Sequence, residues 1–376
     1  MLEQDIIKWR RDLHQIPELG LKEFKTAAYI RNELKKMGYE YEEVLQTGTL
    51  VYLDFKAKET IAFRSDIDGL KITEKNEIDF KSTHDGYMHA CGHDGHMTML
   101  LGFAKYLSES KKTYPYNILL IFQPAEESPG AAKLLIEQNI KEKYHIKAIF
   151  GMHLMPDLTY GKLACRPGPL MAECGELHVK INGKSAHAGL YHQGIDTIMI
   201  ASQMIQLYKS IIVTKISPLN QCLLHIGLIQ GGSSNNIVAS STEFHGTVRT
   251  YSEEDFFVIQ GQMKKINQMM EETYGCTIEF SCDPMYPPVL NDYSIYDYFK
   301  KWATKPGDIE LKEPYMLAED FAFYQTKIPG VFFFLGTNDG TYSSGLHTET
   351  FNFDEKVLLR GIQAYIDLIE HVEKLI

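Results

Sequence analysis

The sequence has no long apolar run and no surplus of basic residues, and each absence excludes a class of protein. None of its apolar stretches reaches the roughly 18 residues that a membrane-spanning helix needs, so no such helix is expected. Its 38 Lys and Arg residues stand against 49 Asp and Glu residues, for a formal net charge of -11. Without a basic excess to neutralise phosphates, the chain is not expected to have nucleic acid as its main partner.

Cysteine is also scarce, with six residues in a chain of 376 and no dense spacing among them. Free thiols in a reducing cytosol are therefore expected rather than a disulfide framework. The first residues are polar and lack the apolar core of a signal peptide. We expect a cytoplasmic protein, and its length allows two domains of ordinary size.

The sequence does contain one dense group of thiol and imidazole side chains. The stretch Met88–His96 holds Cys91 and three histidines, and the apolar run Met97–Leu107 follows it at helical spacing. Because this helix begins near Asp94, its N-terminus is expected to favour a thiolate at Cys91. Taken alone, the stretch fits a structural metal clip, a nucleophilic Cys–His pair or a catalytic metal site.

Four apolar strand-like segments, at 60–63, 117–122, 148–151 and 331–335, are each followed by polar residues. Such strands alternating with helical patterns predict an α/β fold, in which functional sites lie past the carboxyl ends of the strands. The polar residues after these strands and the thiol cluster together supply more ligands than one metal ion needs. We therefore expect two ions about 3.5–4 Å apart. The residues concerned are Asp66, Asp68, Cys91, His93, Glu126, Glu127, His153 and His347.

The adjacent pair Glu126 and Glu127 can divide two roles between them. One carboxylate can bind metal while the other accepts a proton from water, as a hydrolase requires. Adjacent glutamates are most often two exposed charges. This pair, however, follows a buried strand and Pro124, which favours the functional interpretation.

The pattern changes between Cys174 and Pro284, where the predicted elements follow the order β-α-β-β-α-β. This order is typical of a ferredoxin-like α+β unit. We therefore predict a discontinuous catalytic domain, residues 1–174 and 285–376, interrupted by an inserted lid or dimerisation domain, residues 175–284. An exposed edge of the inserted sheet could pair two copies into a homodimer.

Six ordered motifs resemble those of the co-catalytic metal amidohydrolases in the zinc aminopeptidase-like clan. That family includes aminoacylases, hippurate hydrolases, auxin-conjugate hydrolases and N-acetyl-diaminopimelate deacetylases. The resemblance covers nearly the whole chain and implies a three-layer αβα catalytic domain of the zinc-peptidase type. The motifs are Arg11–Glu18, Ser65–Leu70, His89–His96, Phe122–Glu127, Gly151–His153 and Leu346–Glu349.

The resemblance also implies roles for single residues of the catalytic domain. Glu126 would be the general base and later the acid, and Asp68 would orient a metal-bound imidazole. Asp66 stands where relatives in the wider clan have a histidine ligand. Its role is therefore open, either as a metal ligand or as a residue that supports the ligands. Two divalent ions (Zn, Mn, Co or Ni) would be held by Cys91 as the bridging ligand with His93, Glu127, His153 and His347.

In the inserted domain, Gly183–Ala188 resembles the lid motif of the family. Its histidine, His187, would stabilise the oxyanion that forms at the substrate carbonyl. Asn235, Asn236 and Arg249 resemble groups that hold the carboxylate of the substrate, for which an Arg fork is suited. Two further histidines of the thiol cluster, His89 and His96, are expected to support the ligands rather than to bind metal.

The leading hypothesis is a metal-dependent hydrolase that cleaves the amide bond of small N-acyl amino acids. The run 126–130 and the loop 231–236 resemble most the N-acetyl-diaminopimelate deacetylases of lysine biosynthesis, with a hippurate hydrolase or general aminoacylase as the alternative. A dipeptidase or exopeptidase of the same clan is a second hypothesis. A metal-stabilised binding protein without catalysis is a third. A thiol protease acting through Cys91 is the weakest, since no partner that would orient the nucleophile is evident.

Overall fold

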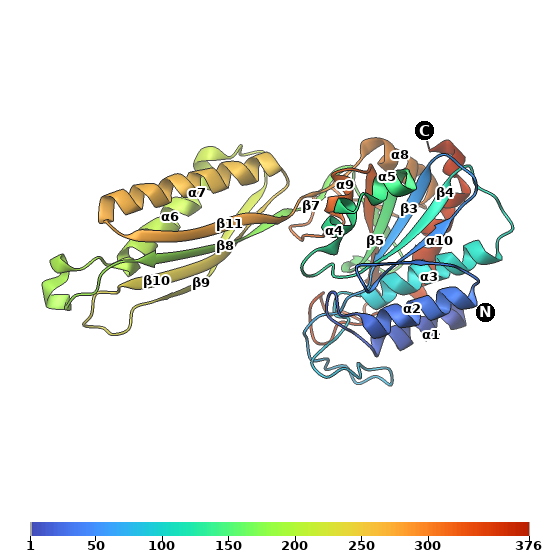
Figure 1. The fold of residues 1–376 in the computed structure, drawn as a ribbon, viewed down its shortest axis with the longest axis horizontal. Coiled ribbons are helices and arrows are strands. Elements are labelled where there is room, and N and C mark those ends of the chain that lie inside the picture. Colours follow the sequence, from blue (N-terminus) through green and yellow to red (C-terminus); the bar gives the residue numbers. More distant parts are fainter. Residues whose placement is uncertain (1, 376) are drawn as a thin grey trace. The chain divides into compact units, whose positions relative to one another are not determined.

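A computed structural model describes residues 2–375, which form two compact units (Figure 1). The first unit comprises Met1–Leu170, Val289–Pro314 and Glu319–Ile376, and the second comprises Met171–Pro288 and Tyr315–Ala318. The boundaries between the units follow residues 170 and 288, whereas the sequence predicted boundaries after residues 174 and 284. Tyr315–Ala318 joins the second unit because Tyr315 forms a parallel β-bridge with Met171.

The four predicted apolar segments are neighbouring parallel strands at the centre of the first unit. They are β3 (Thr60–Asp66), β4 (Asn117–Gln123), β5 (Ile146–Thr159) and β14 (Gly330–Asn338). Every residue of β3 and β4 is buried, as expected for parallel strands covered by helices on both faces. The polar residues that follow these strands therefore start from one edge of the sheet.

Shorter strands complete this sheet, whose order is β1-β2-β4-β3-β5-β14-β6-β13. The outer strands β2 and β6 run antiparallel to β4 and β14, so the sheet is mixed. Two further strands, β7 and β12, form a separate two-stranded sheet. The bounds of these six shorter strands are β1 (Glu42–Val44), β2 (Gly48–Leu53), β6 (Leu163–Cys165), β7 (Gly168–Met171), β12 (Val289–Asn291) and β13 (Ile309–Glu310).

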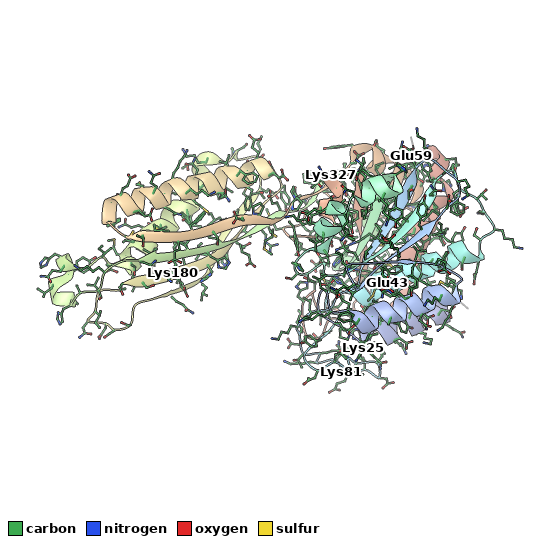
Figure 2. The ribbon with its side chains drawn as sticks, viewed as in Figure 1. Lys25, Glu43, Glu59, Lys81, Lys180 and Lys327 are labelled. Atoms are coloured by element: carbon green, nitrogen blue, oxygen red, sulfur yellow. The ribbon has the colours of Figure 1, made fainter. Side chains whose placement is uncertain are left out.

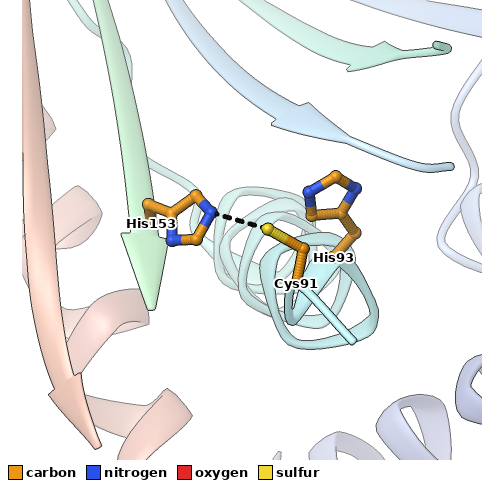
Figure 3. Close-up of side chains that lie close together, drawn as sticks. All are labelled: Cys91, His93 and His153. Atoms are coloured by element: carbon orange, nitrogen blue, oxygen red, sulfur yellow. Dashed lines mark hydrogen bonds between the residues drawn. The ribbon is translucent and has the colours of Figure 1, made fainter. Parts of the chain in front are cut away.

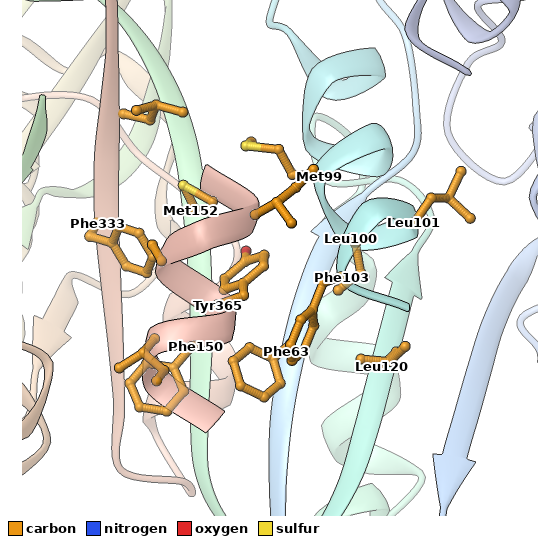
Figure 4. Close-up of a cluster of buried hydrophobic side chains, with 14 of the residues drawn as sticks. Phe63, Met99, Leu100, Leu101, Phe103, Leu120, Phe150, Met152, Phe333 and Tyr365 are labelled. Atoms are coloured by element: carbon orange, nitrogen blue, oxygen red, sulfur yellow. The ribbon is translucent and has the colours of Figure 1, made fainter. Parts of the chain in front are cut away.

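Helices pack on the sheet to give the expected αβα architecture of the first unit. Figure 4 shows part of the core, where Phe63 of β3 meets Phe103 of α3 and Tyr365 of α10, with ring centroids 4.7 and 5.2 Å from that of Phe63. The helices are α1 (Leu2–His14), α2 (Phe24–Lys36), α3 (His93–Glu109), α4 (Ala131–Glu137), α5 (Ile140–Tyr144), α8 (Tyr293–Trp302), α9 (Ala322–Gln325) and α10 (Leu358–Glu370).

Two glycines allow α3 to pack closely against α10. A Cβ atom at Gly102 would lie 2.3 Å from Ile362 Cδ1, and one at Gly361 would lie 2.1 Å from Met99 Sδ. A larger residue at either position would require the contacting side chain to move within a closely packed interior. Because α3 begins at the thiol cluster, this contact helps to fix that cluster against the sheet.

The second unit has the predicted order β-α-β-β-α-β and one four-stranded antiparallel sheet, β11-β8-β10-β9. Helices α6 and α7 cover one face of this sheet through a core that includes Tyr208, Phe244 and Phe256. The other face carries polar side chains, Lys180 among them (Figure 2). The elements are β8 (Glu173–Asn182), α6 (Thr197–Lys215), β9 (Cys222–Gly231), β10 (Ser241–Thr250), α7 (Glu253–Tyr274) and β11 (Thr277–Tyr286).

Within residues 2–375, no helix combines the length and the apolar character that crossing a membrane would require.

Candidate metal centre

Residues far apart in the sequence meet at the carboxyl edge of the central strands. Asp66 is the last residue of β3, and Asp68 follows two positions later. Glu126 and Glu127 follow β4, while His153 lies within β5, which extends beyond its predicted end. His347 comes from the loop after β14 and has a positive φ of 59°.

Cys91 and His93 reach the same place because the chain turns sharply between them. Gly92 caps the N-terminus of α3 in the left-handed region, with a φ of 86°, which a residue with a Cβ rarely adopts. The turn points Cys91 toward His153 of strand β5 and places the ring of His93 on the other side of Cys91 (Figure 3). The glycine within the motif is therefore required by the geometry of the cluster.

Cys91 Sγ is the atom that two groups of candidate ligands share. It lies 3.3 Å from His153 Nε2 and 3.2 Å from His347 Nε2, and His347 Nε2 lies 3.1 Å from Glu127 Oε1. The ligand atoms within each group lie within 4.8 Å of one another. These two of the possible ligand groups are Cys91, His93 and His153, and Cys91, Glu127 and His347.

Hydrogen bonds fix which nitrogen each buried imidazole presents. His93 Nδ1 donates to the backbone oxygen of Asp68 at 2.9 Å, and His153 Nδ1 donates to that of Leu154 at 2.6 Å. Both rings are thus held with Nε2 toward Cys91 and Glu127. A backbone carbonyl that holds the far nitrogen of a ligating histidine is a common feature of metal sites.

The electrostatics of the cluster favour a bound cation. Burial lowers the pKa of His93, but the carboxylates of Asp66 and Asp68 outweigh it and raise that pKa to about 10. Burial and the charges of Glu127 and Glu126 raise the pKa of the Cys91 thiol well above its usual range. Burial and these charges therefore oppose the thiolate that the helix N-terminus is expected to favour. A metal cation would supply the missing positive charge.

The donor set fits divalent metal ions. Within residues 2–375, His93 Nε2 is buried without a hydrogen-bond partner, and Glu127 Oε1 lies 4.0 Å from it. An unpartnered buried nitrogen is costly unless something else binds it. Thiolate, imidazole and carboxylate ligands together suit Zn and its neighbours in the first transition row.

Asp66 has protein partners on both of its oxygens. His96 Nδ1 donates to Oδ1 at 2.8 Å, and Arg64 Nη1 donates to Oδ2 at 2.8 Å. On its other side, His96 Nε2 accepts from the backbone N–H of Leu154 at 2.9 Å. In this arrangement Asp66 and His96 join β3, α3 and β5 behind the candidate ligands, which favours a supporting role for both.

Asp68 holds the turn that carries the two glutamates. Its Oδ1 accepts from the N–H of Glu126 at 3.0 Å, and its Oδ2 accepts from that of Glu127 at 3.1 Å. The same carboxylate lies 3.3 Å from His93 Nδ1. Asp68 thus connects a candidate metal ligand with the backbone of the candidate base.

Glu126 lies in an acidic and buried environment. Burial and the nearby carboxylates of Glu319 and Glu127 raise the pKa of Glu126 well above its usual range. Its Oε1 also accepts from the N–H of Asp320 at 3.3 Å. A carboxyl whose pKa is raised holds a proton more readily than an exposed one, which suits a group that must accept and return a proton.

Glu126 is supported by a group of buried charged residues that the sequence did not reveal. Arg64 lies 3.0 Å from Glu319, 2.7 Å from Asp320 and 2.8 Å from Asp66, and all four side chains are buried. Arg64 could have been noticed in the sequence, because it is a charged residue within the otherwise apolar first part of β3. The sequence around Glu319 and Asp320 gave no such signal, since their partners lie some 250 positions away.

Glu23 is a second residue that the sequence did not reveal. It is fully buried, and it accepts from the N–H of Ala125 at 2.8 Å and from Thr47 Oγ1 at 2.7 Å. Ala125 has a φ of 52°, a strained value for a residue with a side chain. Glu23 and Asp68 therefore hold three successive backbone N–H groups of the turn that ends in Glu126 and Glu127.

We expect Glu23→Ala to lower kcat at least about tenfold, because small displacements of a catalytic group are costly. The free energy of unfolding should fall by about 1–3 kcal/mol, since the N–H of Ala125 loses its buried acceptor. Glu23→Gln keeps an acceptor oxygen and should stay near wild type. The measurements are steady-state kinetics, metal content and thermal unfolding. Equal effects of the two substitutions would contradict this role.

The predicted residues of the inserted domain all belong to the second unit. His187 is exposed and forms a β-bridge with Ile237, and the N–H of Ala188 donates to the backbone oxygen of Asn236 at 3.0 Å. Asn235 and Asn236 are likewise exposed, so the structure brings these two asparagines next to the segment of His187. The guanidinium of Arg249 donates to the backbone oxygen of Met316. Their roles toward a substrate stay predictions.

Comparisons with known proteins identify the family of this chain. Residues 62–371 match the model of the peptidase family M20/M25/M40. A hydrolase of uncharacterised activity from Staphylococcus epidermidis is 37% identical over 373 residues, covering 97% of each chain. An N-acetyldiaminopimelate deacetylase of Exiguobacterium sibiricum is 35% identical over 370 residues, with the same coverage.

Among solved structures, that of a Bacillus subtilis protein, YXEP, described as a dinuclear metal-binding peptidase of the M20 family, has a TM-score of 0.85 and 33% identity. The match covers 100% of this chain and 99% of the Bacillus subtilis chain. A proposed aminohydrolase from methicillin-resistant Staphylococcus aureus has a TM-score of 0.91 and 30% identity, with 100% and 97% coverage. The chain therefore belongs to the peptidase family M20/M25/M40 and is a metal-dependent hydrolase.

Proposed function

We propose that the protein hydrolyses the amide bond of small N-acyl amino acids with two divalent metal ions. The observation that carries this proposal is Glu126, a buried carboxyl beside the candidate ligands and with a raised pKa. A metal site with a purely structural role has no need of such a group, which disfavours a binding protein without catalysis. The matched dinuclear peptidase from Bacillus subtilis supports the number of ions.

Cys91 would be shared by two ions, one also bound by His93 and His153 and the other by Glu127 and His347. When bound, the ions polarise the scissile carbonyl and lower the pKa of water. The carboxylate of Glu126 then takes a proton from the attacking water and delivers it to the nitrogen of the leaving amine.

The same proposal gives roles to side chains of the second unit. His187 would stabilise the negative charge that develops on the carbonyl oxygen of the substrate. Asn235, Asn236 and Arg249 would bind the substrate carboxylate. Substitution of Arg249 should then raise KM for substrates with a free carboxylate more than it lowers kcat.

Metal removal tests the first part of the proposal. Dialysis against a chelator should abolish hydrolysis, and Zn, Mn, Co or Ni added back singly should restore it to different extents. Metal analysis of the restored protein should find at least two equivalents per chain. Activity that survives complete metal removal would contradict the proposal and would favour a thiol mechanism.

A substrate panel tests the second part and separates the alternatives. We expect N-acetyl-diaminopimelate to be the best substrate, as the relative in Exiguobacterium sibiricum indicates. Preference for benzoylglycine would instead indicate a hippurate hydrolase or general aminoacylase. Hydrolysis of free dipeptides in preference to N-acylated amino acids would indicate a peptidase.

We also propose that two copies pair through the edge strand β9 of the second unit. This strand exposes Leu223, Leu228 and Ile229, and the edge of a sheet offers unpaired backbone groups to a second strand. The double substitution Leu228→Lys and Ile229→Lys should convert a dimer to a monomer, as measured by light scattering after gel filtration. A wild-type protein that is monomeric would contradict this proposal.

A further inference from the structure

We propose that His178 and His245, on the open face of the sheet in the second unit, bind one divalent transition-metal ion. This site is formed by residues that take no part in the centre described above. The two histidines are direct partners on the neighbouring antiparallel strands β8 and β10. Their Nδ1 atoms lie 2.6 Å apart, and their ring planes are inclined by 82°.

Two imidazole nitrogens this close need a proton or a metal ion between them, because two lone pairs facing each other would repel. A proton on one ring can fill this place, as in a hydrogen bond between the rings. A metal ion can fill it as well. With metal–nitrogen bonds of about 2.0–2.1 Å in a tetrahedral site, the two nitrogens would lie about 3.3 Å apart, which needs only a small movement of the rings.

The far nitrogen of each ring faces a carboxylate. His178 Nε2 lies 3.5 Å from Glu176 Oε2, and His245 Nε2 lies 4.0 Å from Glu243 Oε1. In each case the glutamate precedes its histidine by two positions on the same strand, so both side chains lie on the same face. A carboxylate behind the far nitrogen orients a metal-ligating histidine and makes it more basic. The sequence thus places the same Glu-x-His arrangement on both strands.

The surrounding charges also favour a cation. Strand pairing places Glu279 and Asp283 of β11 on this face, opposite Lys180 and Glu176. The four carboxylates outnumber the one ammonium group, that of Lys180, which itself lies 3.7 Å from Glu279. The face is thus acidic around the two histidines, which attracts divalent ions.

Solvent can complete the coordination of the ion. The side chains of His178 and His245 are 49% and 33% exposed, so the open side of the pair is accessible to water. Imidazole ligands suit Zn, Ni and Cu, and Cu should bind most tightly in this series. We therefore expect a site that is filled after the buried centre and exchanges its ion more readily.

Zinc uptake by the full chain, measured by equilibrium dialysis and elemental analysis, tests this site. The wild-type protein should bind one zinc ion per chain more than His178→Gln or His245→Gln. The control His192→Gln changes another exposed histidine of the same unit and should bind as much as wild type. Equal uptake by wild type and the double variant His178→Gln, His245→Gln would overturn the proposal and leave a hydrogen-bonded pair.

A spectroscopic measurement identifies the ligands directly. Cu²⁺ added to the zinc-loaded protein should give an electron paramagnetic resonance signal with two nitrogen ligands, and either single substitution should remove one of them. An unchanged signal in both variants would contradict the site. Because the two histidines lie outside the proposed catalytic machinery, hydrolysis by the zinc-loaded variants should stay at the wild-type rate.

Discussion

Glu126→Gln is expected to lower kcat by about 10²–10⁴-fold, the usual contribution of a general acid–base group. The amide keeps the size of the side chain, and its oxygen can still accept from the N–H of Asp320, so the local structure should persist. It has no basic site, however, and cannot take a proton from water. The measurement is the steady-state rate on the best substrate of the panel.

Two comparisons show whether this loss is chemical. Metal content should be unchanged in Glu126→Gln, because Glu126 is not among the proposed ligands of either ion. Glu137→Gln removes an exposed carboxylate from α4 nearby and should keep full activity. If Glu126→Gln retained the wild-type rate, Glu126 would not be the base.

Cys91→Ser is expected to weaken the binding of both metal ions and to lower turnover by about 100-fold or more. Cys91 Sγ is the one atom common to both groups of candidate ligands, and a serine hydroxyl is a weaker ligand than a thiolate. Loss of an ion forfeits several kcal/mol of transition-state stabilisation. Metal content after gel filtration and the rate constant measure the two effects.

His347→Ala is the matched comparison for Cys91. It belongs to one group only, together with Glu127, so it should lower metal content by about one equivalent and leave the other ion in place. A Cys91→Ser protein with full metal content and full activity would refute the bridging role. A pattern in which both variants lose one ion would place Cys91 at a single ion.

The fold was predictable wherever a run of neighbouring residues has the apolar pattern of a strand or a helix. The strands β3, β4, β5 and β14 each contain a short apolar run, as parallel strands buried on both faces do. The inserted unit was also predictable, since alternation in its strands and periodicity in α6 and α7 give the order β-α-β-β-α-β. The sequence did not show the short strands β6, β7 and β13, which exist only because neighbours offer them backbone partners.

The sequence by itself also predicted which side chains would carry the chemistry, because thiol, imidazole and paired carboxylate groups follow the ends of apolar strands. The tertiary structure alone decided how they are supported. Arg64 reaches Asp320 across 256 positions of sequence, and Glu23 reaches Ala125 across 102. Such contacts leave no local pattern, since they depend on how the strands and helices pack and on which buried polar groups need a partner.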